Sequence, residues 1–421
     1  MTGRRITLFL CLCVLAGALC ACSSPASQPN CGPEPCPLMT SCEGALERCV
    51  APDESAAIGH DYPSLAVDAE GRIMVSAYNR SGRDLVFGLW DEIEARFRFQ
   101  RVDTVGDVGR YSALALDSED RPSIVYFDAT NNALKFASWE QEGGWLLETV
   151  DSTSSVGADC DLAIDPDDVA HVSYRDLTYR VLRYARRSEG IWRIEYVDTG
   201  ADESLPAEQA CPLEQRQKAR LGLGYDSHIA LQGASPVISY YDGDCGALRL
   251  ARRSASSWSV QVLDGWDASL WTGPSSEPLT QVGRFNDLAV DLTGNLALAY
   301  HDAGAGKLKV LHFDAGLPVV EVADDGLRRD APGVVSKTLV GQLPSLVFDG
   351  ESKVVSHFDA ASGRALLSTR DATGWRTAQV SSSIEGFEAE LALLPSGERV
   401  VVSAQRIATL SAPIQLIRLV K

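Results

Sequence analysis

Short apolar runs recur along the whole chain, separated by turns rich in Gly, Asp, Asn and Pro. Within each run, apolar residues alternate with polar ones or continue over five to seven positions. This pattern is typical of β-strands, and no helical periodicity stands out. The stretch from Ser112 to Asp151 shows the unit clearly, because SALALD, SIVYFD, ALKFASW and WLLETVD read as four short strands joined by polar turns.

This four-strand unit is present in seven copies. Its first strand recurs at Ser64–Asp68, Ser112–Asp117, Asp161–Asp165, Gly222–Asp226, Asp287–Asp291, Ser345–Asp349 and Glu390–Leu394. Four antiparallel strands repeated every 45 to 65 residues, roughly, are typical of a β-propeller, whose radial closure protects the sheet edges. The sequence therefore predicts an all-β fold, a seven-bladed β-propeller of four-stranded antiparallel blades over residues 58–421.

The seventh copy ends at Lys421 after its third strand, so its outer edge needs a partner from elsewhere. The segment Ala45–Val50 lies ahead of the first copy much as a fourth strand lies ahead of each later copy. We expect this N-terminal strand to complete the last blade and close the ring. The alternative is that the Cys-rich segment 31–57 forms an independent knot.

The N-terminus has the pattern of an export signal. Arg4 and Arg5 precede an apolar run from Ile6 to Leu19, which is too short to span a membrane. The sequence Leu19-Cys20-Ala21-Cys22 resembles the lipobox of bacterial lipoproteins, so residues 1–21 are expected to be a signal peptide and Cys22 the lipidated residue. Residues 22–30 read as a flexible tether, and a plain secretory cleavage is the alternative.

Cysteines outside the signal are expected to form disulfides, because export places them where disulfides persist. Four of them lie close together in a Pro-rich stretch and suggest two disulfides of open pairing, namely among Cys31, Cys36, Cys42 and Cys49. A zinc site there is disfavoured, since the paired CxxC spacing is missing. We expect a further disulfide between Cys211 and Cys245, which leaves Cys160 as a free thiol.

The chain carries a net charge of -19, spread along its whole length. Such acidity opposes binding to nucleic acid or to an anionic lipid surface, and it is consistent with colloidal solubility. We therefore expect membrane attachment through the lipid anchor only, on the bacterial envelope and in the outer membrane.

Three insertions between copies exceed what a scaffold needs, at residues 201–219, 264–282 and 325–340. Long loops are often functional. The tryptophans Trp266 and Trp271 are the two that lie outside the repeated strands, and exposed indoles there would suit a sugar ring or a hydrophobic partner. The alternative is that both indoles pack the loop onto the body.

Charged residues that vary between copies are expected at the mouth of the central channel, just before each first strand. The candidates for ligand binding are Arg110, Asp159, Arg220, Arg284 and Glu388, with Asp61 and Gln342 at the corresponding places. Arginine forks bind carboxylates and hydroxyl-rich ligands. These charges could equally pair with one another.

The aspartates that follow the first and second strands in most copies are predicted to hydrogen-bond the following turns. The six histidines show no metal-ligand spacing, and neither a nucleophile elbow nor a phosphate-binding loop is present in the sequence. The sequence thus predicts no cofactor and no metal, and it names no catalytic residue.

The repeat SLALD, SYYD, LKFA, W, VD resembles the propeller repeats of the sialidase-like and fucose-lectin-like group, and PSLAVDAEGRIMVSAY is also similar to an NHL repeat. The resemblance covers about residues 58–421 and implies the propeller architecture. The Phe/Tyr-Arg-Ile-Pro and SxDxGxxW motifs of sialidases are not found in the sequence, so no sialidase residue is carried over.

The sequence favours a non-enzymatic, membrane-anchored lipoprotein that binds a glycan or protein ligand through its long-loop face. The first alternative is a glycan-acting hydrolase or lyase of sialidase-like form, which needs converging carboxylates in the channel mouth. The second is a structural protein of the cell envelope.

Overall fold

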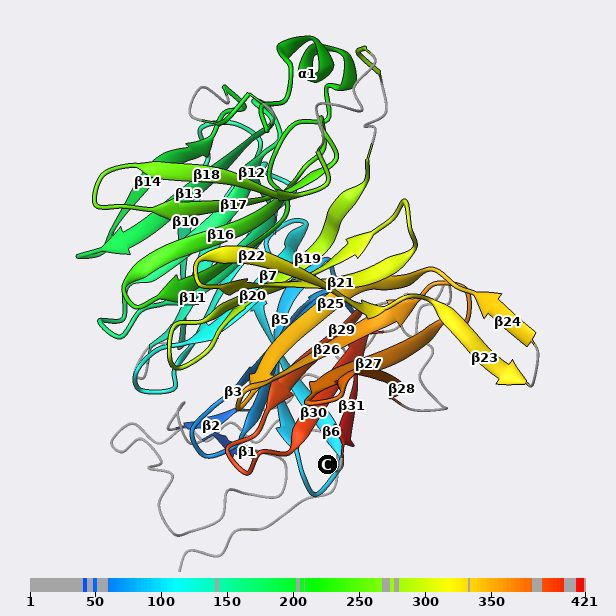
Figure 1. Ribbon diagram of the computed structural model, residues 1–421. Helices are drawn as coiled ribbons and strands as arrows, with labels where there is room; N and C mark the ends of the chain where they lie inside the picture. The colour runs from blue at the N-terminus through cyan, green and yellow to red at the C-terminus, as the bar shows by residue number, and fades with distance from the viewer. Residues whose placement is uncertain are drawn as a thin grey trace, which may run out of the picture.

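The computed structural model describes residues 41–43, 48–50, 60–140, 144–201, 205–207, 209–266, 273–275, 280–331, 334–380, 388–404 and 414–419. These residues form a seven-bladed β-propeller, as predicted. Every blade is an antiparallel meander whose strands pair in chain order (Figure 1). The first strands of neighbouring blades contact one another around the central axis.

Six blades have four strands each. Blade one consists of β3 (His60–Val67), β4 (Ile73–Asn79), β5 (Asp84–Asp91) and β6 (Arg96–Asp103), and blade two of β7 (Val108–Leu116), β8 (Pro122–Asp128), β9 (Ala133–Glu140) and β10 (Gly144–Asp151). Blade three consists of β11 (Val156–Ile164), β12 (Ala170–Asp176), β13 (Val181–Ser188) and β14 (Ile191–Asp198), and blade four of β15 (Tyr225–Gln232), β16 (Ser235–Asp242), β17 (Ala247–Arg253) and β18 (Trp258–Asp264). Blade five consists of β19 (Val282–Val290), β20 (Leu296–Asp302), β21 (Lys307–Asp314) and β22 (Leu317–Asp324), and blade six of β25 (Val340–Asp349), β26 (Ser352–Asp359), β27 (Arg364–Asp371) and β28 (Gly374–Gln379).

Blade seven has three described strands, β29 (Glu388–Leu393), β30 (Arg399–Ala404) and β31 (Gln415–Leu419). Among the described residues, the expected N-terminal fourth strand does not pair with this blade. Arg48–Val50 is strand β2, and it pairs with β1 (Ser41–Glu43), with Cys42 opposite Cys49 in the register. The residues expected to join blade seven thus form a local hairpin instead. Within the described chain the ring closes by direct packing, since β29 and β30 contact β3 and side chains of blades seven and one share one core cluster.

The aspartates after the strands cap turns, as the repeat predicts. Asp68 accepts hydrogen bonds from the backbone N–H groups of Glu70 and Arg72, and Asp176 accepts them from Thr178 and Tyr179. Blade four is an exception, because the first strand begins at Tyr225 and not near Gly222. Asp226 therefore lies at the start of that strand and caps no turn after it.

A second repeated network ties successive blades together. The aspartate that ends a blade accepts hydrogen bonds from a tyrosine and a cation of the next blade. Between blades three and four, Asp198 accepts the Tyr240 hydroxyl at 2.5 Å and Arg249 Nη1 at 3.0 Å, and Arg249 Nη2 reaches Asp242 at 2.9 Å. Equivalent groups join Asp103 to Tyr126 and Lys135, Asp151 to Tyr174 and Arg183, and Asp264 to Tyr300 and Lys309.

The elements that do not belong to the seven blades lie in the insertions. The first holds a short helix, α1 (Leu213–Ala219), which the strand pattern did not predict. The third holds the hairpin β23 (Leu327–Ala331) and β24 (Val334–Lys337). Figure 1 shows α1 and this hairpin projecting beyond the blades. Among the described residues no helix has the length and apolar character needed to cross a membrane.

We expect Gly109→Ala to destabilise the protein by about 2 to 3 kcal/mol, because both strain and a clash oppose the new methyl group. Gly109 has φ of 105°, and a Cβ there would lie 2.7 Å from the Leu85 Cα of the preceding blade. Gly190→Ala is the matched control, since its φ is 74° but its Cβ would meet open space. Urea unfolding measures both. Equal losses for the two variants would contradict the close inter-blade approach at Gly109.

Candidate functional site at the mouth ring

Each first strand of blades one to six contains a bulge near its start, where the register to the second strand shifts. One residue in each bulge has a left-handed backbone with φ between 47° and 54°; these are Tyr62, Tyr111, Asp159, Asp226, Phe285 and Leu343. We call these six residues the mouth ring. Left-handed backbone is uncommon for such side chains, and bulges often re-aim a side chain beside a functional site.

The structure places four of the predicted charged residues at the mouth ring. Asp159 belongs to it, and Asp61, Arg110 and Arg284 directly precede ring residues. Glu388 begins β29 of blade seven. Arg220 does not belong to this set, because it ends helix α1, where its backbone N–H bonds to the Arg216 carbonyl.

The charges next to the ring are partly self-paired. Arg110 binds Asp107 through two hydrogen bonds, at 3.0 and 2.7 Å, and Asp61 pairs with Arg80 at 2.8 Å. Arg284 is exposed and lies over the rings of Tyr241 and Phe285, at 5.9 and 5.2 Å from their centroids. Arg284 makes no ion pair within the described parts of the chain, so its guanidinium can bind a ligand.

Two acidic ring residues occupy the same position in neighbouring blades. Asp159 of blade three and Asp226 of blade four are both half-buried. The Asp226 carboxylate accepts a hydrogen bond from the Phe285 N–H at 2.9 Å, and the backbone of Asp226 donates to Asp159. Burial raises the pKa of Asp159 to about 7, and the charge of Asp226 adds to the rise. Near neutral pH, Asp159 therefore exists in both protonation states.

Aromatic rings and one buried guanidinium surround this pair. Tyr62 and Tyr111 lie in contact with their centroids 4.6 Å apart and their planes tilted by 39°. Arg175 lies flat on the Tyr225 ring, at 3.3 Å from the centroid, and its Nη1 is 4.0 Å from Asp159 Oδ2. Hydrogen bonds to the carbonyls of residues 221 and 223 hold Arg175 in place. The result is a half-buried surface that combines stacking rings with an acid of tuned pKa.

His228 lies on the first strand of blade four, between two carboxylates of the neighbouring blades. Its Nδ1 lies 3.5 Å from Asp161 Oδ2 and 3.4 Å from Asp287 Oδ1, and its side chain is 36% exposed. Burial lowers the pKa of His228, but the hydrogen bond with Asp161 and the charges of Asp287 and Asp161 outweigh it and raise that pKa to about 10. The same carboxylates hold adjacent blades, because Asp161 accepts the Ile229 N–H.

This raised pKa has a consequence for stability. The histidinium of His228 stabilises the folded state fully below the unfolded pKa of about 6.5, and this contribution is lost as the pH rises through 10. We therefore expect the difference in unfolding free energy between the wild type and His228→Gln to be largest near pH 6 and to vanish near pH 10. Urea unfolding across that range measures it, and a difference independent of pH would contradict the assignment.

The free thiol has a structural role. Cys160 is buried and donates its S–H to the Tyr111 carbonyl of the preceding blade at 2.9 Å. At the matching place of other blades, Ser112 and Ser227 donate to the carbonyls of Tyr62 and Asp159. Cys160 thus replaces a serine in a repeated link between blades.

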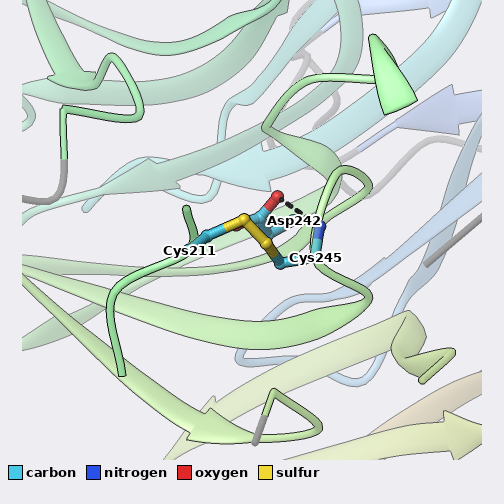
Figure 2. Close-up of side chains that lie close together, drawn as sticks. All are labelled: Cys211, Asp242 and Cys245. Carbon is cyan, nitrogen blue, oxygen red and sulfur yellow. Dashed lines mark hydrogen bonds between the residues drawn. A yellow bond between two sulfur atoms is a disulfide. The ribbon is translucent and has the colours of Figure 1, made fainter. Parts of the chain in front are cut away.

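The first insertion is fixed beside the mouth ring. The predicted disulfide between Cys211 and Cys245 is confirmed, and Figure 2 shows it beside Asp242, which accepts the Cys245 N–H at 3.3 Å. Buried Gln215 joins the insertion to Asp244 and to Ser275 of the second insertion, through bonds of 2.9 to 3.1 Å. The disulfide and these hydrogen bonds therefore fasten the first insertion to blade four and to the second insertion.

The expectation of an exposed tryptophan pair is wrong for Trp266. Its side chain is 8% exposed and packs in a cluster with Cys211, Cys245 and Val262. The indole covers the disulfide and fastens the loop. Trp271 lies outside the described residues, as do Cys22, Cys31 and Cys36.

In the part of the chain that the structure describes, two groups of residues have ligand atoms close enough for a metal ion. In the first, Cys211 and Cys245 are joined by the disulfide and offer no thiolate. In the second, Asp68 and Glu70 lie near Asp120, but Arg72 binds both Asp68 and Glu70. Neither group has the character of a metal site.

Asp226, His228 and Tyr225 are site residues that were not identified from the sequence. The reason is the misplaced first strand of blade four. The signal was present in the sequence, since YDSHIALQ alternates in polarity and a two-residue turn separates it from SPVISYYD. Asp226 was thereby counted among the turn-capping aspartates.

No protein-family model and no curated protein matches the chain. Solved structures do match it. A polysaccharide lyase is 9% identical over 84% of this chain and 88% of its own, with a TM-score of 0.49. The α-L-arabinanase of Penicillium chrysogenum complexed with arabinobiose is 11% identical over 74% and 92%, with a TM-score of 0.47. A leech intramolecular trans-sialidase is 10% identical over 87% and 69%, with a TM-score of 0.42. These likenesses concern the propeller fold alone.

Proposed function

We propose that this protein cleaves a glycosidic bond of a glycan bound at the mouth ring. The observation that supports the proposal is the pair Asp159 and Asp226, at matched bulge positions of neighbouring blades, with the pKa of Asp159 raised to about 7. Glycosidases use two carboxyl groups whose environments separate their protonation states. This reading replaces the non-enzymatic one, which relied in part on an exposed Trp266.

Each residue has a role in this chemistry. Asp159 in its protonated form donates a proton to the leaving oxygen, and the Asp226 carboxylate takes a proton from the water that attacks the anomeric carbon. Arg175 holds Asp159 from below at 4.0 Å. Arg284 and the tilted pair of Tyr62 and Tyr111 offer a guanidinium fork and aromatic rings to the sugar.

The experiment is incubation of the purified protein with a panel of polysaccharides that covers neutral, uronic-acid and sialic-acid glycans. New reducing ends indicate hydrolysis, and absorbance of an unsaturated uronate indicates a lyase. We expect new ends from at least one glycan and no unsaturated product. A protein that cleaves none of the panel, in a preparation shown to be folded, would overturn the proposal.

We also propose that the protein works while anchored to the bacterial envelope through lipidated Cys22. The support is the signal-like N-terminus and the lipobox-like Leu19-Cys20-Ala21-Cys22. An anchored enzyme would act on glycans at the cell surface or in the periplasm. Mass spectrometry of the mature N-terminus should find Cys22 as the first residue with lipid attached, and an unmodified N-terminus elsewhere would contradict this.

A further inference from the structure

The junction between blades five and six departs from the repeated network. In blades two to five, a tyrosine on the second strand stands opposite a lysine or arginine on the third; the pairs are Tyr126 and Lys135, Tyr174 and Arg183, Tyr240 and Arg249, and Tyr300 and Lys309. In blade six, His357 stands opposite Leu366 at these two positions. Two smaller side chains thus replace the tyrosine and the long cation found in blades two to five.

A cleft of about 900 Å³ lies at this junction, and Leu366 lines it. The aspartate of the network, Asp324, is still present. Its cation comes from another direction, because Arg328 on β23 binds both of its oxygens, at 2.9 and 2.8 Å. His357 Nε2 is 3.7 Å from Asp324 and does not replace the tyrosine hydroxyl. The third insertion therefore supplies the missing charge and leaves the space open.

The lining of the cleft has balanced charge. Three cations, Lys307, Arg328 and Arg364, face three carboxylates, Asp324, Asp325 and Asp359. Such a lining gives no net attraction to an ionic ligand, but it provides both donors and acceptors. The hydroxyl of Thr377 and the amide of Gln379 add to these.

One aromatic face completes the cleft. Trp375 lines it, and its indole N–H donates to Glu321 Oε2 at 2.9 Å, which fixes the ring. Arg370 holds the same Glu321 through bonds of 2.8 to 3.1 Å. A fixed aromatic ring beside polar groups with both donors and acceptors matches a sugar, which has an apolar face and a rim of hydroxyls.

We propose that this cleft is a second carbohydrate site, which binds a neutral saccharide without cleaving it. The site is built from blades five and six and the β23–β24 hairpin, whereas the acidic pair of the mouth ring lies on blades three and four. The inference does not depend on cleavage at the mouth ring. It would let the protein hold one part of a glycan while another part is free to reach the ring.

Calorimetric titration with neutral gluco-, manno-, galacto- and xylo-oligosaccharides of about five sugar units tests the site. We expect at least one of them to bind the wild type. The double variant His357→Tyr and Leu366→Lys introduces the tyrosine and lysine that blades two and five have at these positions, so it should weaken this binding tenfold or more while its melting temperature is unchanged or higher.

A second variant keeps the test decisive if the double variant does not fold. Thr377 is exposed on β28, so Thr377→Arg should fold normally and fill the cleft. Asp159→Asn is the control for the mouth ring, and it should bind the oligosaccharide as the wild type does. The inference is overturned if no neutral oligosaccharide binds the wild type, or if folded Thr377→Arg and the double variant bind it undiminished. Binding lost only in Asp159→Asn would place the saccharide at the mouth ring instead.

Discussion

Asp159→Asn is expected to reduce glycan cleavage by a factor of about 10² to 10⁴. The asparagine keeps the shape of the side chain and can accept the hydrogen bond from the backbone of Asp226, but it has no acidic proton to donate. The measurement is kcat/KM on a glycan that the wild type cleaves. The matched control is Glu119→Gln, because Glu119 is an exposed carboxylate in the turn after a first strand, and its loss should leave kcat/KM unchanged.

Stability separates a catalytic loss from a folding defect in this variant. Asp159 has a raised pKa in the folded state, so the folded protein favours its protonated form, and ionisation costs stability progressively as the pH rises from about 4 to 7. Asparagine does not ionise. At pH 8 the variant should therefore melt no lower than the wild type. A lower melting temperature together with low activity would indicate that Asp159 supports the fold and would count against its role as the acid.

Arg249→Ala is expected to lower the free energy of unfolding by about 3 to 5 kcal/mol, which is the range for breaking a buried ion pair. Arg249 is 1% exposed and binds Asp198 at 3.0 Å and Asp242 at 2.9 Å. Alanine leaves Asp198 buried without a cation, with the Tyr240 hydroxyl and the Gly200 N–H as its remaining donors, although Arg216 still binds Asp242 at 3.0 Å. Urea unfolding measures the loss.

Two control variants accompany Arg249→Ala. Arg249→Lys should lose much less stability, because lysines occupy the same place in blades two and five. Arg253→Ala removes a half-buried pair with Glu195 and should cost about 1 kcal/mol or less. A loss for Arg249→Ala no larger than that for Arg253→Ala would show that the inter-blade network contributes little to stability.

The architecture could be predicted from the sequence because every blade repeats the same burial pattern. The second strand of blade two is buried along its whole length, and its outer strand is half-buried or exposed through its middle and buried at its ends. Alternation and turns specify strands locally, and seven copies specify the ring. The pairing of the N-terminal strand β2 could not be predicted from the sequence, because it depends on which other strand is available as a partner. Strand β1 is closer to β2 in sequence than blade seven is, and the two form a local hairpin.

The candidate site was only partly predictable, because it depends on register. A shift of the first strand by a few residues changes which side chains fall in a bulge. Arg110, Asp159 and Arg284 were placed correctly, whereas Arg220 and Asp226 were not, since the first insertion obscures where blade four begins. Burial is equally a tertiary property. Trp266 looked like a loop residue in the sequence, and the disulfide it covers makes it part of a core.

The pH dependence of kcat/KM, measured for the wild type and for Asp226→Asn, tests the central claim most directly. If Asp159 is the proton donor, activity of the wild type should fall as the pH rises through about 7. Removing the charge of Asp226 lowers the pKa of Asp159, so the residual activity of Asp226→Asn should fall at a lower pH. A descending limb at the same pH in both proteins would show that another group is the acid and would contradict the assignment of the mouth ring as the active site.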